Sequence, residues 1–393
     1  MIPELRKKFN EEFSQSAYDK FSSELNSSFK YPADFRVSET PIFLSPEFKD
    51  ELIKACEEIL GQIISIEFLE NSKNSVPEKL FIPNETDHPE FLQIDFAVTR
   101  DPEGKLLPKL VELQGFPSLY AYQFYLQKMY RKHYAIDRNL TTYFSGLTDT
   151  AYSEKIKSIL LADSNPENVV LVEIYPDKQK TRIDFSATEK LFGISTVSIT
   201  NVKEKDSHLY YSKNGKDVLI KRIYNRVIFD ELIRKNVKVN FDIKKNLKVK
   251  WLPHPNWFFK ISKHSLPFLK GKYVSNSYYL DRLNKYPENL NNYVLKPLFS
   301  FAGYGVIIDL NKDILNSLVD KQNYILQEKI EYAPVIETLD EPAKVEIRMM
   351  FVWEEEPLLV NNLVRLSKGK MMGVDYNKNK SWVGSSIAFY KSI

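Results

Sequence analysis

A lysine at the end of a predicted strand, followed by a loop with two glycines, is the clearest chemical signal in the sequence. Lys296 ends the strand, and Gly303 and Gly305 lie in the loop that follows. Such a lysine can neutralise nucleotide phosphates, while backbone N–H groups of a glycine loop close over them. Residues 324–330 then read as a strand that runs into a hinge and can offer backbone groups to an adenine edge. The three features in this order predict a nucleotide site, whereas the glycines alone could form a simple hairpin turn.

Candidate metal ligands lie far upstream, on two predicted strands. Asp95 falls in a strand over 92–99, and Glu112 falls in the next strand, over 108–114. Gln114 shares a face with Glu112 because side chains repeat every two residues along a strand. Oxygen ligands of this kind suit Mg²⁺, which usually takes one or two carboxylates together with substrate phosphates. The alternative is that Glu112 and Gln114 face solvent on a half-exposed strand.

Helices and strands along the whole chain must position these residues. The polar stretch 4–30 reads as helical, and an amphipathic helix follows the Ser-Pro pair at 45–46. A buried strand, a helix closed by glycine and a second strand over 169–199 form the pattern of a parallel βαβ unit. A hairpin is expected across Asn-Gly at 214–215. The last third is β-rich, with strands expected at 293–297, 306–309, 324–328, 345–353 and 358–366.

Length and composition exclude several classes of protein. The chain has 393 residues, and 55 Lys+Arg against 52 Asp+Glu leave a formal charge of +3, which is too small for a nucleic-acid coat. The single cysteine, Cys56, excludes an intramolecular disulfide and any multi-cysteine metal site. The first residues lack a signal peptide, and no apolar run approaches the ~20 residues that span a bilayer. We therefore expect a cytoplasmic protein with neither a nucleic-acid nor a membrane partner.

Taken in order, the segments resemble the circularly permuted ATP-grasp ligases, namely the eukaryotic-type glutathione synthetases and the glutathionylspermidine synthetase type. The resemblance is spread over about residues 36–390. The motifs that carry it are Phe-Arg-Val-Ser-Glu-Thr-Pro at 35–41, Ile-Asp-Phe at 94–96, Val-Glu-Leu-Gln at 111–114, Tyr-Asn-Arg at 224–226, Ile-Ser-Lys at 261–263, Val-Leu-Lys-Pro at 294–297, Ile-Leu-Gln-Glu-Lys-Ile at 325–330 and Leu-Val-Arg at 363–365. It implies an α/β (α+β) ATP-grasp fold, circularly permuted, with an inserted parallel βαβ substrate unit.

The resemblance also implies a reaction and the residues that carry it. A carboxylate would be joined to an amine through an acylphosphate, with ATP and Mg²⁺ as cofactors and an amino acid, peptide or polyamine among the small-molecule substrates; the related enzymes favour a homodimer. Lys263 and Lys296 would bind the phosphates, the loop 300–305 would cover them, and Glu112 with Gln114 would hold Mg²⁺. The other assignments are adenine contacts by Gln327, Glu328 and Ile330, and catalytic roles for Arg365, Asp95 and, in reserve, Arg348.

The same resemblance divides the chain into four segments. Residues 1–90 would form a helical N-terminal segment, and 91–160 the metal-strand part of the ATP-grasp core. Residues 161–250 would form the inserted βαβ substrate domain, and 251–393 the nucleotide-binding and lid region. The aromatic side chains that follow the metal strand either line an acceptor pocket or belong to the core: Phe116, Tyr120 and Tyr122.

This sequence departs from the family pattern at three places. The family's arginine before the aspartate is Gln93, and its Glu-x-Asn metal pair is Glu112-x-Gln114. The acidic residue that the family places between the Lys-Pro pair and the glycines is missing from 298–301. Two alternatives therefore stand beside the ligase: a catalytically degenerate protein that binds nucleotide or peptide without turnover, and an interaction protein that uses its aromatic surface.

Overall fold

A central antiparallel sheet organises the computed structural model, which describes residues 1–300 and 303–392. The strand order is β17-β16-β15-β2-β3. Its strands come from two distant parts of the chain: β2 (Phe91–Arg100), β3 (Leu106–Gln114), β15 (Lys344–Trp353), β16 (Pro357–Ser367) and β17 (Gly384–Ser386). The predicted strands of both parts are confirmed. Alternating apolar side chains such as Ile94 and Phe96 bury one face of β2 in the main core, which leaves the other face for polar residues.

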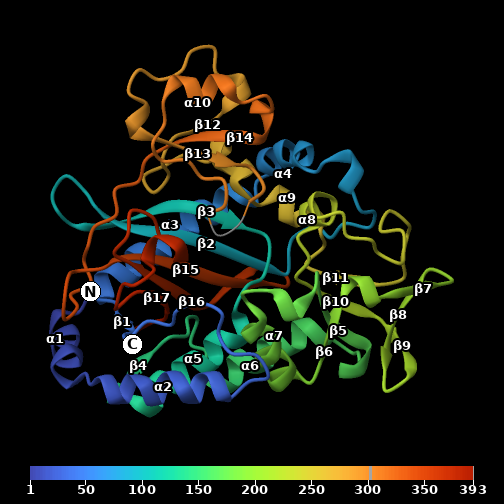
Figure 1. Ribbon diagram of the computed structural model, residues 1–393, viewed down its shortest axis with the longest axis horizontal. Coiled ribbons are helices and arrows are strands. Elements are labelled where there is room, and N and C mark those ends of the chain that lie inside the picture. The colour runs from blue at the N-terminus through green and yellow to red at the C-terminus, as the bar shows by residue number, and fades with distance from the viewer. Residues whose placement is uncertain (301–302, 393) are drawn as a thin grey trace.

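An upper lobe carries the predicted nucleotide lysine and hinge (Figure 1). Its sheet has the order β12-β14-β13, formed by β12 (Ser277–Tyr279), β13 (Tyr293–Pro297) and β14 (Tyr324–Glu328), with α10 (Lys312–Ser317) beside it. The prediction of a strand at 306–309 is wrong, because this segment makes only an isolated bridge between Leu295 and Ile307. A small apolar cluster beneath α10 gives the lobe its own core.

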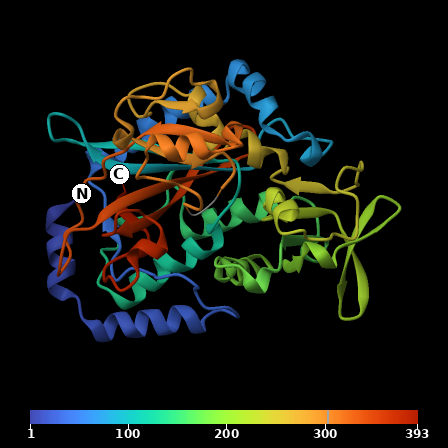
Figure 2. The same cartoon turned by 45° about the horizontal axis from the view of Figure 1, so that its top comes forward.

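A second lobe is built on a parallel sheet, in the order β11-β10-β5-β6. It contains β5 (Val169–Glu173), α7 (Arg182–Phe192), β6 (Ser195–Ser198), β10 (Arg222–Asn225) and β11 (Lys250–Leu252). The pair β5 and β6 is parallel with α7 between them, so the predicted βαβ unit is confirmed. The three-stranded sheet β7 (Lys203–Lys205), β8 (His208–Lys213) and β9 (Lys216–Ile220) extends from this lobe, and its predicted hairpin turn lies between β8 and β9 (Figures 1 and 2).

Helices from the first half of the chain cover the sheets. They are α1 (Pro3–Glu12), α2 (Gln15–Ser27), α3 (Pro46–Ile63), α4 (Ile66–Ser72), α5 (Tyr120–His133) and α6 (Asp149–Leu161), with α8 (Phe229–Arg234) and α9 (Asn256–Lys260) further on. The prediction of one helix over 4–30 is wrong, because Phe13 is extended and the Ser14 side chain caps a new helix through the N–H of Ala17. A small sheet, β1 (Ile42–Phe43), β18 (Ala388–Lys391) and β4 (Leu140–Thr141), ties the chain's end to this region.

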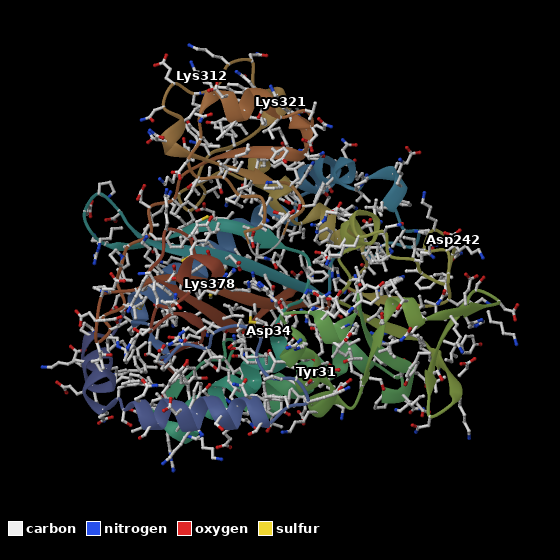
Figure 3. All side chains as sticks on the ribbon, in the orientation of Figure 1. Tyr31, Asp34, Asp242, Lys312, Lys321 and Lys378 are labelled. Carbon is white, nitrogen blue, oxygen red and sulfur yellow. The ribbon has the colours of Figure 1, made fainter. Side chains whose placement is uncertain are left out.

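Charged side chains mark the outer surfaces of the lobes. Exposed Lys312 lies on the upper lobe, and exposed Asp242 on the lobe with the parallel sheet (Figure 3). Tyr120 and Tyr122 are almost wholly buried in the core, so packing accounts for both of them. Among the described residues, no helix combines the length and the apolar character that crossing a membrane would need.

Candidate functional site

Asp95 is the centre of a buried charge cluster on the polar face of the central sheet. On β2 it is directly opposite Glu112 of β3 on one side and Arg348 of β15 on the other. Arg348 holds both carboxylate oxygens of Asp95, with Nε and Nη2 each at 2.6 Å. Arg365 of β16 donates to the same carboxylate at 2.6 Å. The strands β2, β15 and β16 thus bring two arginines to the carboxylate of Asp95. The two predicted acidic residues, Asp95 and Glu112, are cross-strand neighbours.

A third carboxylate, Glu346, completes the arginine side of the cluster. Its Oε1 lies 2.6 Å from Arg365 Nη2, and its Oε2 accepts a hydrogen bond of 2.6 Å from the Tyr332 hydroxyl. Sequence analysis did not select Glu346, although it is two residues before Arg348 and therefore shares its face of β15. Burial raises the pKa of Glu346, in spite of the charge of Arg365 beside it.

The two predicted phosphate lysines converge on Glu112, although they come from different segments. Lys263 begins a short 3₁₀ helix (Lys263–Phe268), and its Nζ lies 3.0 Å from Glu112 Oε2. Lys296, on β13 of the upper lobe, donates to the carbonyl oxygen of Val111 at 3.2 Å. Both lysine side chains are buried, with residue exposures of 6% and 8%. The structure therefore brings both lysines to the end of β3, the strand that carries Glu112.

Burial and mutual charge set the protonation of this cluster. Burial lowers the pKa of Lys296 to about 8; the attraction of Glu112 opposes this shift, and Lys263 adds to it. Burial alone would raise the pKa of Glu112, but the cations around it, Lys263 foremost, outweigh burial and lower this pKa to about 2. The carboxylate is thus ionised at neutral pH, while Lys296 is the group that a bound anion would most readily stabilise.

The predicted metal pair is already engaged with protein groups. The side-chain amide of Gln114 donates to Glu112 Oε1 at 2.6 Å, and Gln93 accepts a hydrogen bond from Arg348 Nη1 at 3.0 Å. Among residues 1–300 and 303–392, no three His, Cys, Asp or Glu side chains are grouped to hold a metal ion. The described part of the chain therefore presents no preformed magnesium cage, and a metal here would depend on oxygens from a bound phosphate.

The segment after Lys296 fills the space next to Glu112. The Phe299 ring packs against Phe259, with 5.1 Å between the ring centroids, and lies nearly parallel to the His264 ring. The Ser300 carbonyl accepts a hydrogen bond from Lys263 Nζ. The cavity left beside Glu112 has about 10 Å³, roughly the space of one water. A phosphate group could reach Lys263 only if the contact with Ser300 gave way.

The hinge strand places one polar side chain on the same face as Lys296. Lys296 pairs with Ile325, and Gln327 is two residues further along β14, so both side chains point from the same side of that sheet. Gln327 is 1% exposed, and neither of its side-chain polar atoms has a hydrogen-bond partner among the described residues. Such a buried amide costs free energy unless a ligand pairs with it. It is therefore the best-supported of the predicted adenine contacts.

The other predicted adenine and loop residues are placed differently. The Glu328 carboxylate accepts hydrogen bonds from the backbone and side chain of Asn276, and its own N–H donates to the carbonyl of Asn276 at 2.9 Å. Ile330 is partly buried just beyond β14. Gly303 and Gly305 have φ of +76° and +73° in the turn before Ile307, a conformation that favours glycine. Phe301 and Ala302, also part of the predicted loop, lie outside the described residues.

Comparison with known proteins bears on the fold. The sequence matches no family model and no curated protein. In the comparison of structures, the chain is similar to the apo form of a glutathione synthetase-like effector from Globodera pallida, with a TM-score of 0.58. The match covers 97% of this chain and 98% of that chain at 11% sequence identity. The chain thus has the mixed α/β fold of this glutathione synthetase-like protein, which confirms the resemblance at the level of the fold.

Proposed function

We propose that the protein is an ATP-dependent ligase that joins a carboxylate to an amine through an acylphosphate. The observation that carries this proposal is a buried excess of positive charge where the upper lobe meets the central sheet. The cluster contains four cations, Lys263, Lys296, Arg348 and Arg365, against three carboxylates, Asp95, Glu112 and Glu346, so 4 − 3 leaves one uncompensated positive charge. A buried cationic cluster of this kind is poised to bind an anion such as a triphosphate.

The environment of each residue supports a separate role. Lys263 and Lys296 would hold the phosphates, and the unpaired amide of Gln327 would meet the adenine. Arg365 is the arginine that can reach a reacting group, because 31% of its side chain is exposed against 7% for Arg348. Arg348 donates to the Asp95 carboxylate and would be a positioning residue that orients the cluster.

The reaction is one of phosphoryl transfer followed by aminolysis. The substrate carboxylate attacks the γ-phosphorus and ADP leaves; the amine then attacks the acyl carbon, loses a proton and expels phosphate, which forms the amide. Arg365 would offset negative charge as the phosphoryl group migrates, which is mainly a matter of positioning and electrostatics. Magnesium, when bound with the nucleotide, would neutralise phosphate charge, with Glu112 as the protein carboxylate nearest to it. The same proposal includes a small-molecule acid and an amine as substrates, a circularly permuted order of the fold's segments, and assembly as a homodimer.

A second candidate is a protein that binds nucleotide without turning it over. Two observations favour it: the described residues form no three-ligand metal group, and Phe299 with Ser300 occupies the place where the family has its additional acid. Weak metal binding would leave phosphate charge uncompensated and slow the transfer step. This candidate predicts ATP binding with no ADP release.

Turnover distinguishes the two candidates. Purified protein is incubated with Mg²⁺, ATP and a panel of amino acids, short peptides and polyamines, and ADP and phosphate release are followed. The ligase predicts release that requires one acid and one amine together, and that falls at least about a hundredfold in Arg365→Gln. The matched control, Arg138→Gln on the exposed surface, should leave the rate unchanged. ATP binding without release from any pair would support the second candidate and contradict the ligase.

A further inference from the structure

A cleft lies at the far ends of the strands that carry the charge cluster. It has a volume of about 420 Å³ and is lined by the start of β10 and β11, the end of β15 and one side of α6. Glu90, directly before β2, and Trp353, the last residue of β15, form part of its wall. Glu90 is five residues from Asp95 along the strand, or roughly 16 Å at ~3.3 Å per residue. The cleft is therefore separate from the proposed nucleotide site.

Among the described residues, Glu90 lines this cleft and leaves one carboxylate oxygen without a hydrogen-bond partner. The residue is 8% exposed, and its Oε1 forms an ion pair of 3.2 Å with Lys250 Nζ. Its Oε2 is buried and has no hydrogen-bond partner among the described residues. A buried carboxylate oxygen without a donor is costly, and a ligand that supplies an N–H would remove that cost.

An aromatic wall stands next to this carboxylate. The His88 ring stacks on Trp353 at 4.9 Å between centroids and 8° between planes. The Trp353 backbone N–H donates to the Glu90 carbonyl at 2.9 Å, so the indole and the carboxylate belong to one rigid unit. Ile159 and Leu252 add apolar surface to the lining. A ligand with a short hydrocarbon part would bury it here.

The unpartnered oxygen of Glu90, and not the total charge around the cleft, selects the sign of the ligand. Four carboxylates line the cleft, those of Glu85, Asp87, Glu90 and Glu354, together with the cations Arg222 and Lys250. Lys260 pairs with Glu85 and Lys155 with Glu354, so the charges of this region balance. Arg222 is held by the carbonyls of Ile159 and Leu160, each at 2.8 Å. Asp87 is exposed at the rim. An ammonium group can donate to the unpartnered Oε2 of Glu90, whereas a carboxylate would be repelled by it.

We propose that this cleft binds an alkylammonium ligand. The ammonium group donates to Glu90 Oε2, the hydrocarbon chain lies along Trp353, and a second amine, where the ligand has one, reaches Asp87. The inference rests on the cleft's own residues and does not require the proposed ligase activity. It therefore stands or falls independently of nucleotide binding.

The test uses the full-length protein without nucleotide and 1,4-diaminobutane as the probe, titrated by calorimetry at low salt. Saturable binding is expected for the wild type, and Glu90→Gln should weaken it by about tenfold or more, because a charge-assisted hydrogen bond is lost. Glu341→Gln, the same substitution at an exposed site paired with Lys380, is the matched control and should bind as the wild type does. Butyrate, which has a comparable chain and the opposite charge, should not bind.

The inference would be overturned by a folded wild-type protein that takes up no diamine, or by a folded Glu90→Gln protein that binds it unchanged. Binding of butyrate as strongly as the diamine would do the same. If Glu90→Gln does not fold, as judged by circular dichroism, Trp353→Leu takes its place, because it keeps the carboxylate and removes the aromatic wall. A several-fold loss of diamine affinity in that variant would support the site, and an unchanged affinity would contradict it.

Discussion

Asp95 shows how a single side chain in this protein joins strands that are remote in the sequence. It receives hydrogen bonds from two arginines on two different strands, and it is 1% exposed. Its role in the fold could be inferred from the sequence only as far as its position on a strand, because the arginines lie some 250 residues away. The pairing of β2 with β15 decides the contact, and no local pattern encodes this pairing.

Removing that charge should destabilise the protein strongly. Asp95→Asn leaves the buried guanidinium of Arg348 without its carboxylate, which costs about 3–5 kcal/mol for a buried ion pair broken on one side. Chemical unfolding in urea measures the free energy of unfolding. The control is Asp309→Asn, which removes an exposed ion pair with Lys370 and should change the stability by no more than about 0.5 kcal/mol. If the free energy of unfolding falls as little in Asp95→Asn as in the control, Asp95 and Arg348 do not form a buried ion pair that stabilises the protein.

Lys296 should give the protein a distinctive dependence of stability on pH. Burial lowers its pKa to about 8 in the folded protein, against about 10.4 in an unfolded chain. Between these values the unfolded state binds more protons, so this lysine makes the folded state more stable as the pH rises. Relative to Lys296→Met, the wild type should gain about 2 kcal/mol between pH 8 and pH 10. Urea unfolding at several pH values across this range measures the free energy of unfolding of both proteins. If it changes with pH equally in the two, the pKa of Lys296 is not lowered.

At the scale of elements, periodic patterns predicted the strands well and the connections between them poorly. The alternation in β2 and β3 predicted that Asp95 and Glu112 lie on neighbouring strands, and the structure places them opposite each other. The apolar run of β5 predicted the parallel lobe. The break at Phe13 was missed because both flanking segments have helical composition, and only the cap of Ser14 marks the boundary. Sequence alone also gave no signal for Phe299 packing onto α9, because that contact joins segments far apart in the chain.

One glycine controls the approach of β3 to the lysine-bearing segment. Gly115 directly follows β3, and a Cβ there would lie 2.6 Å from the carbonyl oxygen of Trp257 and 3.0 Å from the Ile261 side chain. Gly115→Ala should therefore push Glu112 away from Lys263 and lower both stability and ATP affinity, the stability by about 1–3 kcal/mol. Gly61→Ala, in α3 with nothing within 4 Å of the new Cβ, is the control and should stabilise by up to about 1 kcal/mol. Thermal unfolding with and without ATP measures both effects; equal behaviour of the two variants would contradict this role of Gly115.

At the scale of the whole molecule, the proposed nucleotide site is formed by parts that are remote in sequence. The upper lobe supplies Lys296 and Gln327, the central sheet supplies the carboxylates and arginines, and the segment after α9 supplies Lys263. The fold agrees with that of the glutathione synthetase-like effector over nearly the entire chain. Lys263 donates to the Ser300 carbonyl, so we expect nucleotide binding to require this hydrogen bond to open.

The most direct test of this account is a calorimetric titration of the wild type and Lys296→Met with ATP in the presence of Mg²⁺. We expect one site per chain in the wild type, and affinity reduced at least about tenfold in the variant, since a buried charge-assisted contact to phosphate is lost. Lys312→Met, on the exposed surface of α10, should bind as the wild type does. A folded wild-type protein that binds no ATP, or a Lys296→Met protein that binds it equally well, would contradict the proposed nucleotide site.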